Sequence, residues 1–189
     1  KMINEENWLG SRLKCRLEVI PIKGWNRDMG YSLPIAPSPN LPNDISIKLY
    51  PSLCFFEGTR VSIGRGTECP FQVFGHPDLQ GNYSFTPQSI KGVSDHPKFE
   101  KTACNGKDLR LEVGPATKMT QLDLSHLIDA YKQLGSKDDF FTSFFIKLAG
   151  TPQLQSQIQS GMTAEAIRDS WKADLQDFEK LRRKYLLYQ

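Results

Sequence analysis

Five prolines crowd into one short stretch of this chain and limit what it can form there. A proline lacks an amide hydrogen and has a fixed φ, so it is excluded from helix interiors and central strands. We therefore expect residues 33–51 to form a stiff loop. Its large apolar residues, such as Leu41 and Ile45, are unusual for a linker. The five prolines are Pro34, Pro37, Pro39, Pro42 and Pro51.

Alternating apolar and polar residues predict short strands on both sides of this loop. From position 13 to position 19 every second residue is apolar, which is typical of a strand with one buried face, here over residues 12–22. Residues 70–74 indicate a short strand or a buried edge, and residues 109–113 a second alternating strand. Between them, residues 75–93 are expected to be irregular.

The last third of the chain has helical periodicity. Thr120 is a plausible N-cap of one helix, and Gly135 a natural stop. Aromatic residues follow at helical spacing over 140–148, and a short helix is expected to open at Pro152. Thr163 starts a long helix whose apolar stripe is expected to face the core. That stripe consists of Ile167, Trp171, Leu175, Phe178, Leu181 and Tyr185.

The order of these elements and the composition define the class of protein. Strands and loops come before helices, so the expected fold class is α+β, with a small mixed or antiparallel sheet, long irregular loops and a helical C-terminal third. The chain has 189 residues, of which 39% are hydrophobic and 24% charged, which excludes a disordered tail. The net charge of +3 is far from that of a dedicated nucleic-acid binder. No apolar run approaches the ~20 residues that would span a membrane.

Cysteine and histidine spacing fits no metal motif, and we expect neither a metal site nor a cofactor. None of the four cysteines belongs to a CxxC pair, and the histidines lie far apart. We interpret the cysteines as free thiols. An alternative is a nucleophilic thiol, with Cys54 or Cys69 activated by His76. This alternative predicts a reactive thiol in an alkylation assay.

The segment from residue 57 to residue 67 is the richest in functional side chains. Glycines flank Arg65 on both sides, which lets the backbone turn tightly and presents a guanidinium group that can hold a carboxylate or phosphate. The GxxxxGK[ST] pattern of a phosphate-binding loop is not satisfied. An equal alternative is that Glu57 and Arg65 form a structural ion pair. Glu57 and Asp95 are the carboxylates of interest for acid catalysis.

Several of these runs resemble one bacterial family. They are the proline-rich run through Asn40, the segment Leu49–Thr59, Gly64–Thr67 with Pro70-Phe71, and the aromatic C-terminal ending from residue 167. Together they resemble the exo-β-N-acetylmuramidases of glycoside hydrolase family 171. Residues 1–11 resemble that family's junction after its catalytic domain.

The resemblance implies a two-domain enzyme that removes N-acetylmuramic acid from peptidoglycan fragments. Residues 12–189 would be the C-terminal substrate-cleft domain, and a Rossmann-like N-terminal domain would carry catalysis, so this chain is expected to be inactive alone. Arg65 would bind the lactyl carboxylate of the sugar. The family's substrate suggests a location in the periplasm or outside the cell. Further substrate-site candidates are Glu57 (also a weak catalytic candidate), Thr59, Gly64, Gly66, Thr67 and Asn40.

Two other interpretations stay open at this point. The chain could be a non-catalytic module that binds cell-wall glycan, which predicts the same site without turnover. It could also be an interaction domain whose aromatic C-terminal helix docks a partner, although that helix could pack on the domain's own sheet instead.

Overall fold

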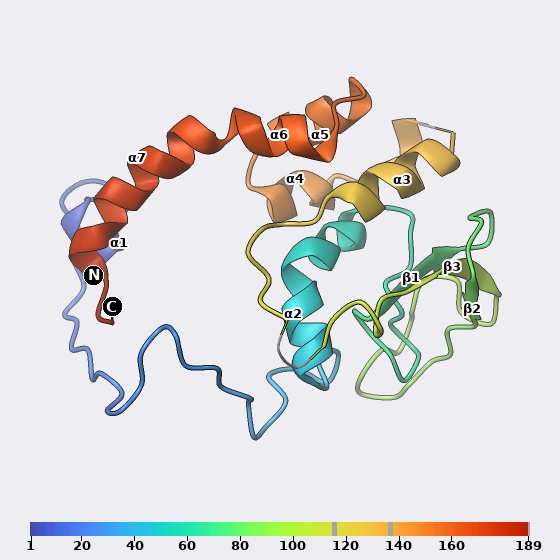
Figure 1. Cartoon of the computed structure of the whole chain (residues 1–189), viewed down its shortest axis with the longest axis horizontal. Helices are drawn as coiled ribbons and strands as arrows, with labels where there is room; N and C mark the ends of the chain where they lie inside the picture. The colour runs from blue at the N-terminus through green and yellow to red at the C-terminus, as the bar shows by residue number, and fades with distance from the viewer. Residues whose placement is uncertain (115–116, 136–137, 189) are drawn as a thin grey trace. The chain divides into compact units, whose positions relative to one another are not determined.

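The computed structural model describes residues 1–114, 117–135 and 138–188. The chain divides into two compact units (Figure 1). The central unit comprises residues 33–167, and the terminal unit comprises residues 1–32 together with 168–189. The fold class is α+β, as predicted, with a small antiparallel sheet and several helices.

Most elements belong to the central unit. In chain order they are α2 (Asp44–Leu53), η1 (Cys54–Gly58), β1 (Val73–His76), β2 (Tyr83–Phe85), β3 (Cys104–Asp108), α3 (Ser125–Gln133), η2 (Asp138–Phe140), α4 (Phe144–Ala149) and α5 (Gln153–Gln159). Helix α6 (Ala164–Ser170) contains the boundary between the units. The terminal unit holds α1 (Met2–Glu5), α7 (Lys172–Arg182) and η3 (Arg183–Tyr185).

The sheet has the order β1-β3-β2, with both pairs antiparallel. Gly106 of β3 lies opposite Gly75 on one side, and a Cβ there would come within 1.9 Å of the Phe74 carbonyl oxygen. The strand predicted at 109–113 is wrong, because β3 ends at Asp108. The Asp108 carboxylate accepts hydrogen bonds from the backbone and side chain of Arg110, and this local turn stops the strand.

Helix α2 corrects the prediction of a loop over residues 33–51. Residues 33–43 are irregular as expected, but a helix begins at Asp44 and includes Pro51. Asn43 and Ser46 form a reciprocal capping box that fixes its start. Pro51 lies in the last turn, where a missing amide hydrogen removes only one bond, so the proline ends the helix soon after rather than preventing it.

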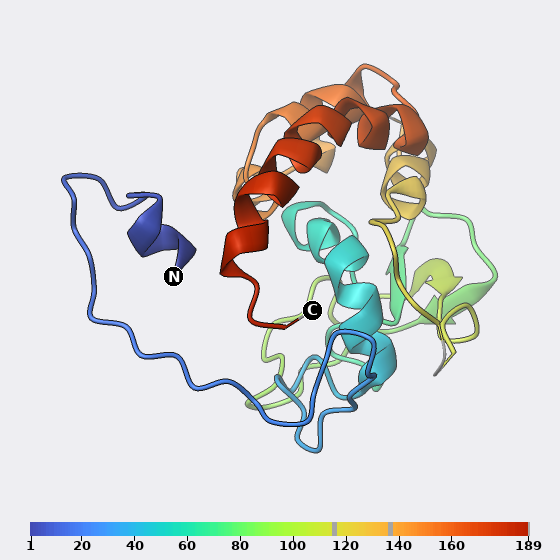
Figure 2. The same ribbon diagram turned by 60° about the vertical axis from the view of Figure 1, so that its left-hand side comes forward.

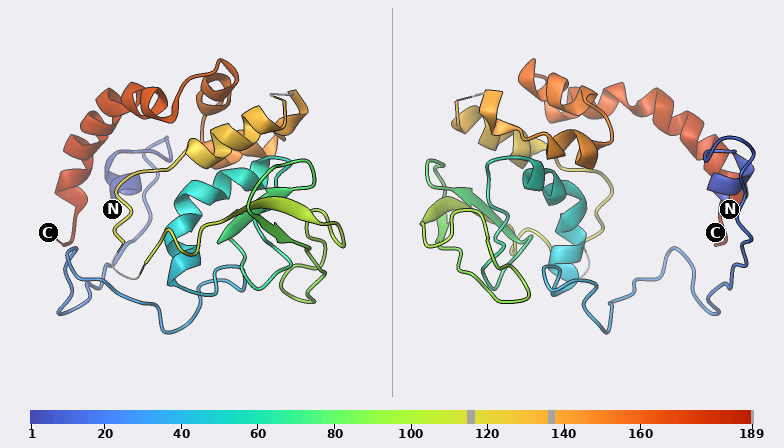
Figure 3. Two further views of the ribbon diagram at one scale, coloured as in Figure 1. Left: turned by 45° about the vertical axis from the view of Figure 1, so that its right-hand side comes forward. Right: turned by 180° about the vertical axis from the view of Figure 1, so that it is seen from behind.

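The core of the central unit holds η1 in place beside the sheet, and Figure 3 shows α2 and the sheet side by side. The rings of Phe56 and Phe74 stack with centroids 5.0 Å apart. A Cβ on Gly58 would lie 2.5 Å from the Cα of Phe145, so η1 and α4 are in backbone contact. Large side chains with almost no exposure include Phe56, Phe71, Phe140, Phe145, Leu53, Leu109, Leu124 and Leu127.

The helix boundaries differ from the predicted ones, and the aromatic run predicted over 140–148 forms an α-helix only from Phe144 onward. Helix α3 begins at Ser125 rather than near Thr120, and the Asp123 carboxylate accepts hydrogen bonds from the backbone and hydroxyl of Ser125. Thr163 caps the long helix predicted to start there, since its hydroxyl accepts from the Ala166 amide at 3.1 Å. That helix is broken at Trp171 into α6 and α7.

The stripe along the broken helix is only partly buried. Ile167 is fully buried, but no residue of α7 is, and Leu175 and Phe178 are about half exposed. The expectation that the whole stripe faces the core is therefore wrong for α7. The apolar residues of α7 do lie at helical spacing, but spacing does not show whether another part of the protein packs against the apolar face.

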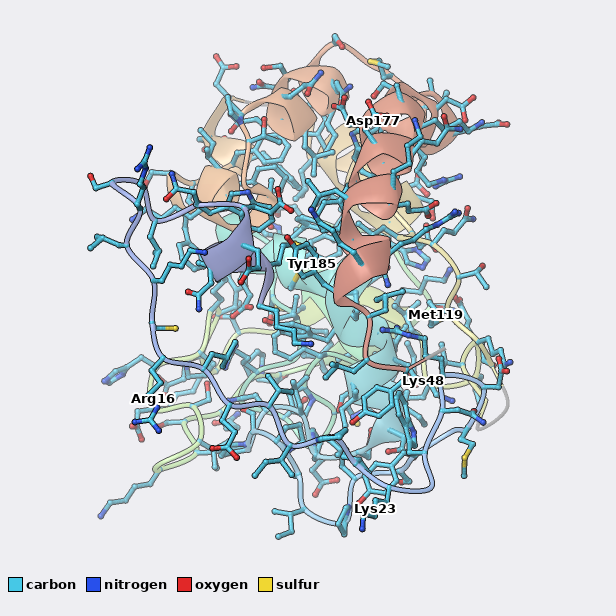
Figure 4. All side chains as sticks on the ribbon, turned by 90° about the vertical axis from the view of Figure 1, so that its left-hand side faces the viewer. Arg16, Lys23, Lys48, Met119, Asp177 and Tyr185 are labelled. Atoms are coloured by element: carbon cyan, nitrogen blue, oxygen red, sulfur yellow. The ribbon has the colours of Figure 1, made fainter. Side chains whose placement is uncertain are left out.

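The terminal unit shows where the strand prediction fails. Residues 12–22 form no strand with any described residue, and Figure 2 follows them as an extended trace. Figure 4 labels Arg16 within this segment and Lys23 just after it. The Asn4 side chain donates to the Cys15 carbonyl and accepts from its amide, at 2.8 and 3.2 Å. The Asn4 side chain thus makes the two backbone hydrogen bonds at Cys15 that a neighbouring strand would otherwise make.

No helix within the described ranges is long and apolar enough to cross a membrane. Over the same ranges, no three histidine, cysteine, aspartate or glutamate side chains gather as a metal site.

Candidate functional site

The segment that the sequence singled out is fixed along its length by the fold. Its first residue, Glu57, belongs to η1. Further on, Ser62 and Gly75 exchange backbone hydrogen bonds of 2.8 and 2.9 Å, so the segment pairs with the outer edge of β1. The Phe71 amide donates to the Ile63 carbonyl at 2.8 Å. The side chains of this segment therefore project from a held backbone.

A tight turn presents Arg65. The Thr67 amide donates to the Gly64 carbonyl at 3.1 Å, which places Arg65 and Gly66 at the two central positions. Gly66 has φ +79°, as a type II turn requires at its third residue. A Cβ on Gly66 would meet the Gln88 carbonyl at 2.5 Å. Glycine is thus required both by the backbone angle and by the neighbouring loop.

Arg65 is both an ion-pair partner and a pocket residue. Its Nη2 donates to Glu57 Oε1 at 2.6 Å, and its guanidinium lies 5.1 Å from the centroid of the Phe71 ring. The Arg65 side chain is 36% exposed, and the Glu57 side chain 20%. The two interpretations from sequence, structural pair and ligand contact, are therefore compatible in this geometry.

A pocket of about 200 Å³ opens beside this pair. One wall is the 57–65 segment and the other is the loop at 94–98. The charged lining groups are one carboxylate, from Glu57, and two cations, from Arg65 and Lys98. A mouth with an excess of positive charge favours a small anionic ligand. The other lining residues are Ser62, Ile63, Ser94, His96 and Pro97.

Lys98 is a site residue that the sequence did not reveal. Its ammonium donates to the carbonyl oxygens of Phe56, Glu57, Thr59 and Val61, at 3.1, 3.2, 2.5 and 3.3 Å. The residue as a whole is exposed, whereas its ammonium end lies among these carbonyls. Burial lowers the pKa of Lys98 to about 8, with Glu57 raising it and Arg65 lowering it. No local sequence pattern marks a lysine that binds carbonyls about forty residues away.

The other predicted site residues support the loops and do not line the pocket. Thr59 is fully buried, and its hydroxyl donates to the Phe56 carbonyl and accepts from the Val61 amide. The Thr67 hydroxyl donates to the Gly64 carbonyl at 2.6 Å. Asn40 is buried, and its amide donates to the Val93 carbonyl at 2.9 Å, next to the pocket loop.

The thiol alternative finds no support in the geometry. Burial raises the pKa of Cys54 to about 11 and raises that of Cys69 as well, so both remain protonated thiols at neutral pH. Cys69 accepts from the Arg110 guanidinium at 3.0 Å. His76 Nδ1 instead accepts from the backbone amide of Asp78. Asp95, the other carboxylate of interest, is exposed and accepts from the Gly92 amide.

Comparison with known proteins decides the family. Residues 48–188 match the family described as exo-β-N-acetylmuramidase NamZ, C-terminal, and residues 1–45 match its N-terminal counterpart. The chain belongs to the NamZ family. The N-terminal match reaches residue 45, further along the chain than the junction expected at residue 11.

Two kinds of relative support the NamZ assignment. The peptidoglycan β-N-acetylmuramidase NamZ of Bacillus subtilis (strain 168) is 34% identical, with 91% of this chain and 45% of that protein covered. A crystal structure of a DUF1343 family protein from Bacteroides fragilis NCTC 9343 is 44% identical, with a TM-score of 0.90, and covers all of this chain and 53% of the other.

A second DUF1343 protein of that Bacteroides strain is more distant. It is 21% identical with a TM-score of 0.78, covers all of this chain and 54% of the other, and indicates the fold alone. The chain thus spans about half the length of the relatives that it matches.

Proposed function

We propose that this chain forms the substrate wall of a peptidoglycan-degrading exo-β-N-acetylmuramidase. In this proposal the pocket between residues 57–65 and 94–98 takes a terminal N-acetylmuramic acid. Arg65 binds the lactyl carboxylate, the group that distinguishes this sugar from N-acetylglucosamine. The substrate is cell-wall material, so the protein acts in the periplasm or outside the cell.

The observation that carries the proposal is the presentation of Arg65 in a pocket with excess positive charge. Its bond to Glu57 uses one guanidinium nitrogen, and the remaining N–H groups can still donate to a carboxylate. The Phe71 ring under the guanidinium restricts its orientation before a ligand arrives. A preoriented arginine loses less entropy on binding than a free one.

Catalysis is assigned to a partner domain at the N-terminus. Glycosidases of the usual kinds use two carboxyl groups around the scissile bond. Glu57 is the one carboxylate among the described lining residues, and it is already ion-paired with Arg65. We therefore expect this chain alone to bind sugar without turnover. A non-catalytic glycan-binding module is the second candidate, favoured by the same single carboxylate.

Binding of N-acetylmuramic acid, followed by NMR chemical-shift perturbation, tests the site. The expected result is selective shifts in residues 57–67 and 94–98, with weaker shifts for N-acetylglucosamine. Arg65→Ala should lower the affinity for the acidic sugar roughly tenfold or more, the effect of losing a charge-assisted hydrogen bond.

Arg60→Ala is the matched control for this variant. Arg60 lies in the same segment but pairs with Asp139 at 2.8 Å, outside the pocket lining. If Arg65→Ala in the full-length enzyme kept the preference for muramic acid over glucosamine, the role of Arg65 would be wrong. Turnover by the full-length enzyme and not by this chain would separate the enzyme from the binding module.

A further inference from the structure

The ammonium group of Lys98 occupies a ring of backbone oxygens that belongs to the site itself. Two of the four carbonyls, from Phe56 and Glu57, are at the end of η1, and that of Phe56 also accepts from the amide and the hydroxyl of Thr59. The other two, from Thr59 and Val61, belong to the segment that follows. A cation at this place supplies a donor to these carbonyls and is favoured by the negative end of the helical turn.

The same loop holds the segment at its other end. Pro97 packs on the Arg65 turn so closely that a Cβ on Gly66 would lie 2.7 Å from the proline Cγ. The Gln88 amide also donates to the Gly66 carbonyl at 2.8 Å. The consecutive residues Pro97 and Lys98 thus fix the two ends of the segment, one next to Arg65 and the other next to Glu57.

We propose that Lys98 is a positioning residue whose ammonium group holds the Glu57 and Arg65 side chains in the arrangement that accepts an anionic sugar. The identity of the sugar rests on the proposed function, whereas the coupling of Lys98 to the pair exists in the free protein. An ammonium shares three N–H groups among these four oxygens, whereas a neutral amine has two N–H groups and a lone pair that the oxygens repel. Loss of the proton therefore weakens the hold on the carbonyls, the end of η1 relaxes, and Glu57 moves relative to Arg65.

The charged and titratable groups that face Lys98 in the pocket are Glu57, Arg65 and His96. Burial lowers the pKa of Lys98 to about 8, while hydrogen bonds to carbonyls favour its charged form. Carboxylates and guanidinium groups do not ordinarily titrate in the alkaline range near that value. A transition near that pH that appears at Lys98, Glu57 and Arg65 together therefore reports the titration of Lys98.

An NMR titration of this chain from neutral to alkaline pH tests the coupling without any ligand. The probes are the Lys98 Cε, Glu57 Cδ and Arg65 Nε signals. We expect the Glu57 and Arg65 signals to move with the midpoint of Lys98 itself. Lys98→Met should abolish this step, while His96→Gln and Lys91→Met, an exposed lysine ahead of the same loop, should keep it. Glu57 and Arg65 signals that ignore the Lys98 midpoint would overturn the proposal.

The wild-type titration decides the matter even if Lys98→Met does not fold. Affinity for N-acetylmuramic acid gives the second measurement, and it should fall at least about fivefold as Lys98 loses its proton. In Lys98→Met the affinity should be low and independent of pH over the same range. Coupled signals without any sugar binding would retain the positioning role and reject the proposed function. A Lys98→Met variant with wild-type affinity and pH profile would reject the positioning role.

Discussion

The central and terminal units have similar amphipathic sequences but bury their apolar residues very differently. In the central unit, Phe56 and Val73 are completely buried. In the terminal unit, Leu13 is 60% exposed and Ile20 is 84% exposed. Alternation and helical spacing therefore define which face of an element is apolar. They do not define whether anything covers that face.

The two units also differ in how their backbones are held. The 57–67 segment exchanges backbone hydrogen bonds with β1, whereas the extended N-terminal segment relies on scattered side-chain contacts. The Tyr188 hydroxyl accepts from the Ile22 amide at 2.6 Å, and the Tyr188 ring meets Trp25 edge-on with centroids 4.9 Å apart. Exposed contacts of this kind contribute little each, so the terminal unit should open more readily than the central one.

The largest expected effect comes from removing a core ring. Phe56→Ala should destabilise the protein by about 3–5 kcal/mol, because it leaves a cavity against the Phe74 ring. Phe178→Ala in α7 removes a ring that is 45% exposed and should change stability by less than about 0.5 kcal/mol. Urea unfolding followed by tryptophan fluorescence and circular dichroism measures both. Similar losses for the two variants would mean that α7 is covered in solution.

Glycine substitutions give the next contrast. Gly106→Ala should cost about 3 kcal/mol, because its Cβ would overlap the Phe74 carbonyl at the centre of the sheet. A Cβ added at Gly30 in the terminal unit would meet no atom within 4 Å, so Gly30→Ala should be close to neutral. Thermal unfolding of the two variants distinguishes them. A neutral Gly106→Ala would show that strands β1 and β3 can separate enough at this point to admit a methyl group.

Local signals in the sequence predicted local structure well. Thr163 as an N-cap, Gly135 as a helix stop and the glycines around Arg65 all follow from backbone chemistry within a few residues. The strand over 12–22 failed because a strand needs a partner that no local pattern specifies. Helix α2 was missed because the rule against proline outweighed the capping signal of Asn43 and Ser46.

The same limit applies to the candidate site. Glu57 and Arg65 are eight residues apart, and their pairing could be foreseen as one of two alternatives. Lys98 lies 37 to 42 residues from the four carbonyls that it binds, and it makes those contacts through backbone oxygens that every residue type carries. Only the fold brings them together, so sequence alone could not place Lys98 in the pocket.

A smaller effect on stability is expected from a change of pH. The histidines that contribute to it, His76 and His126, both lie in the central unit. Burial lowers the pKa of His76 and His126 below the ordinary value of 6.5, although nearby Asp123 and Glu112 oppose this at His126. The unfolded chain therefore takes up these protons first as pH falls below 6.5, and stability decreases. His126→Gln should flatten the stability curve between pH 6.5 and roughly pH 5. Equal slopes in the wild-type protein and in His126→Gln would contradict the assignment.

The smallest effect should come from the contact that joins the two ends of the terminal unit. Glu6 accepts hydrogen bonds from the Lys184 ammonium at 2.6 Å and from the Tyr185 hydroxyl, and Tyr185 is labelled in Figure 4. These bonds, with that of Lys184 the stronger, hold the pKa of Glu6 below its ordinary value of 4.5. The contact is thus intact above that pH and is lost as pH falls through the lowered pKa.

Glu6→Gln should therefore speed amide hydrogen exchange at residues 183–188 a few-fold, roughly the effect of one exposed ion pair. Exchange in the central unit should not change. Glu5→Gln is the matched control. Glu5 also faces a lysine, Lys14, but the separation is a long 3.8 Å and both side chains are largely exposed, so this pair is weak. If the two variants exchange alike at the C-terminus, then the aromatic contact of Trp25 with Tyr188, and not the Glu6 pair, holds the terminal unit closed.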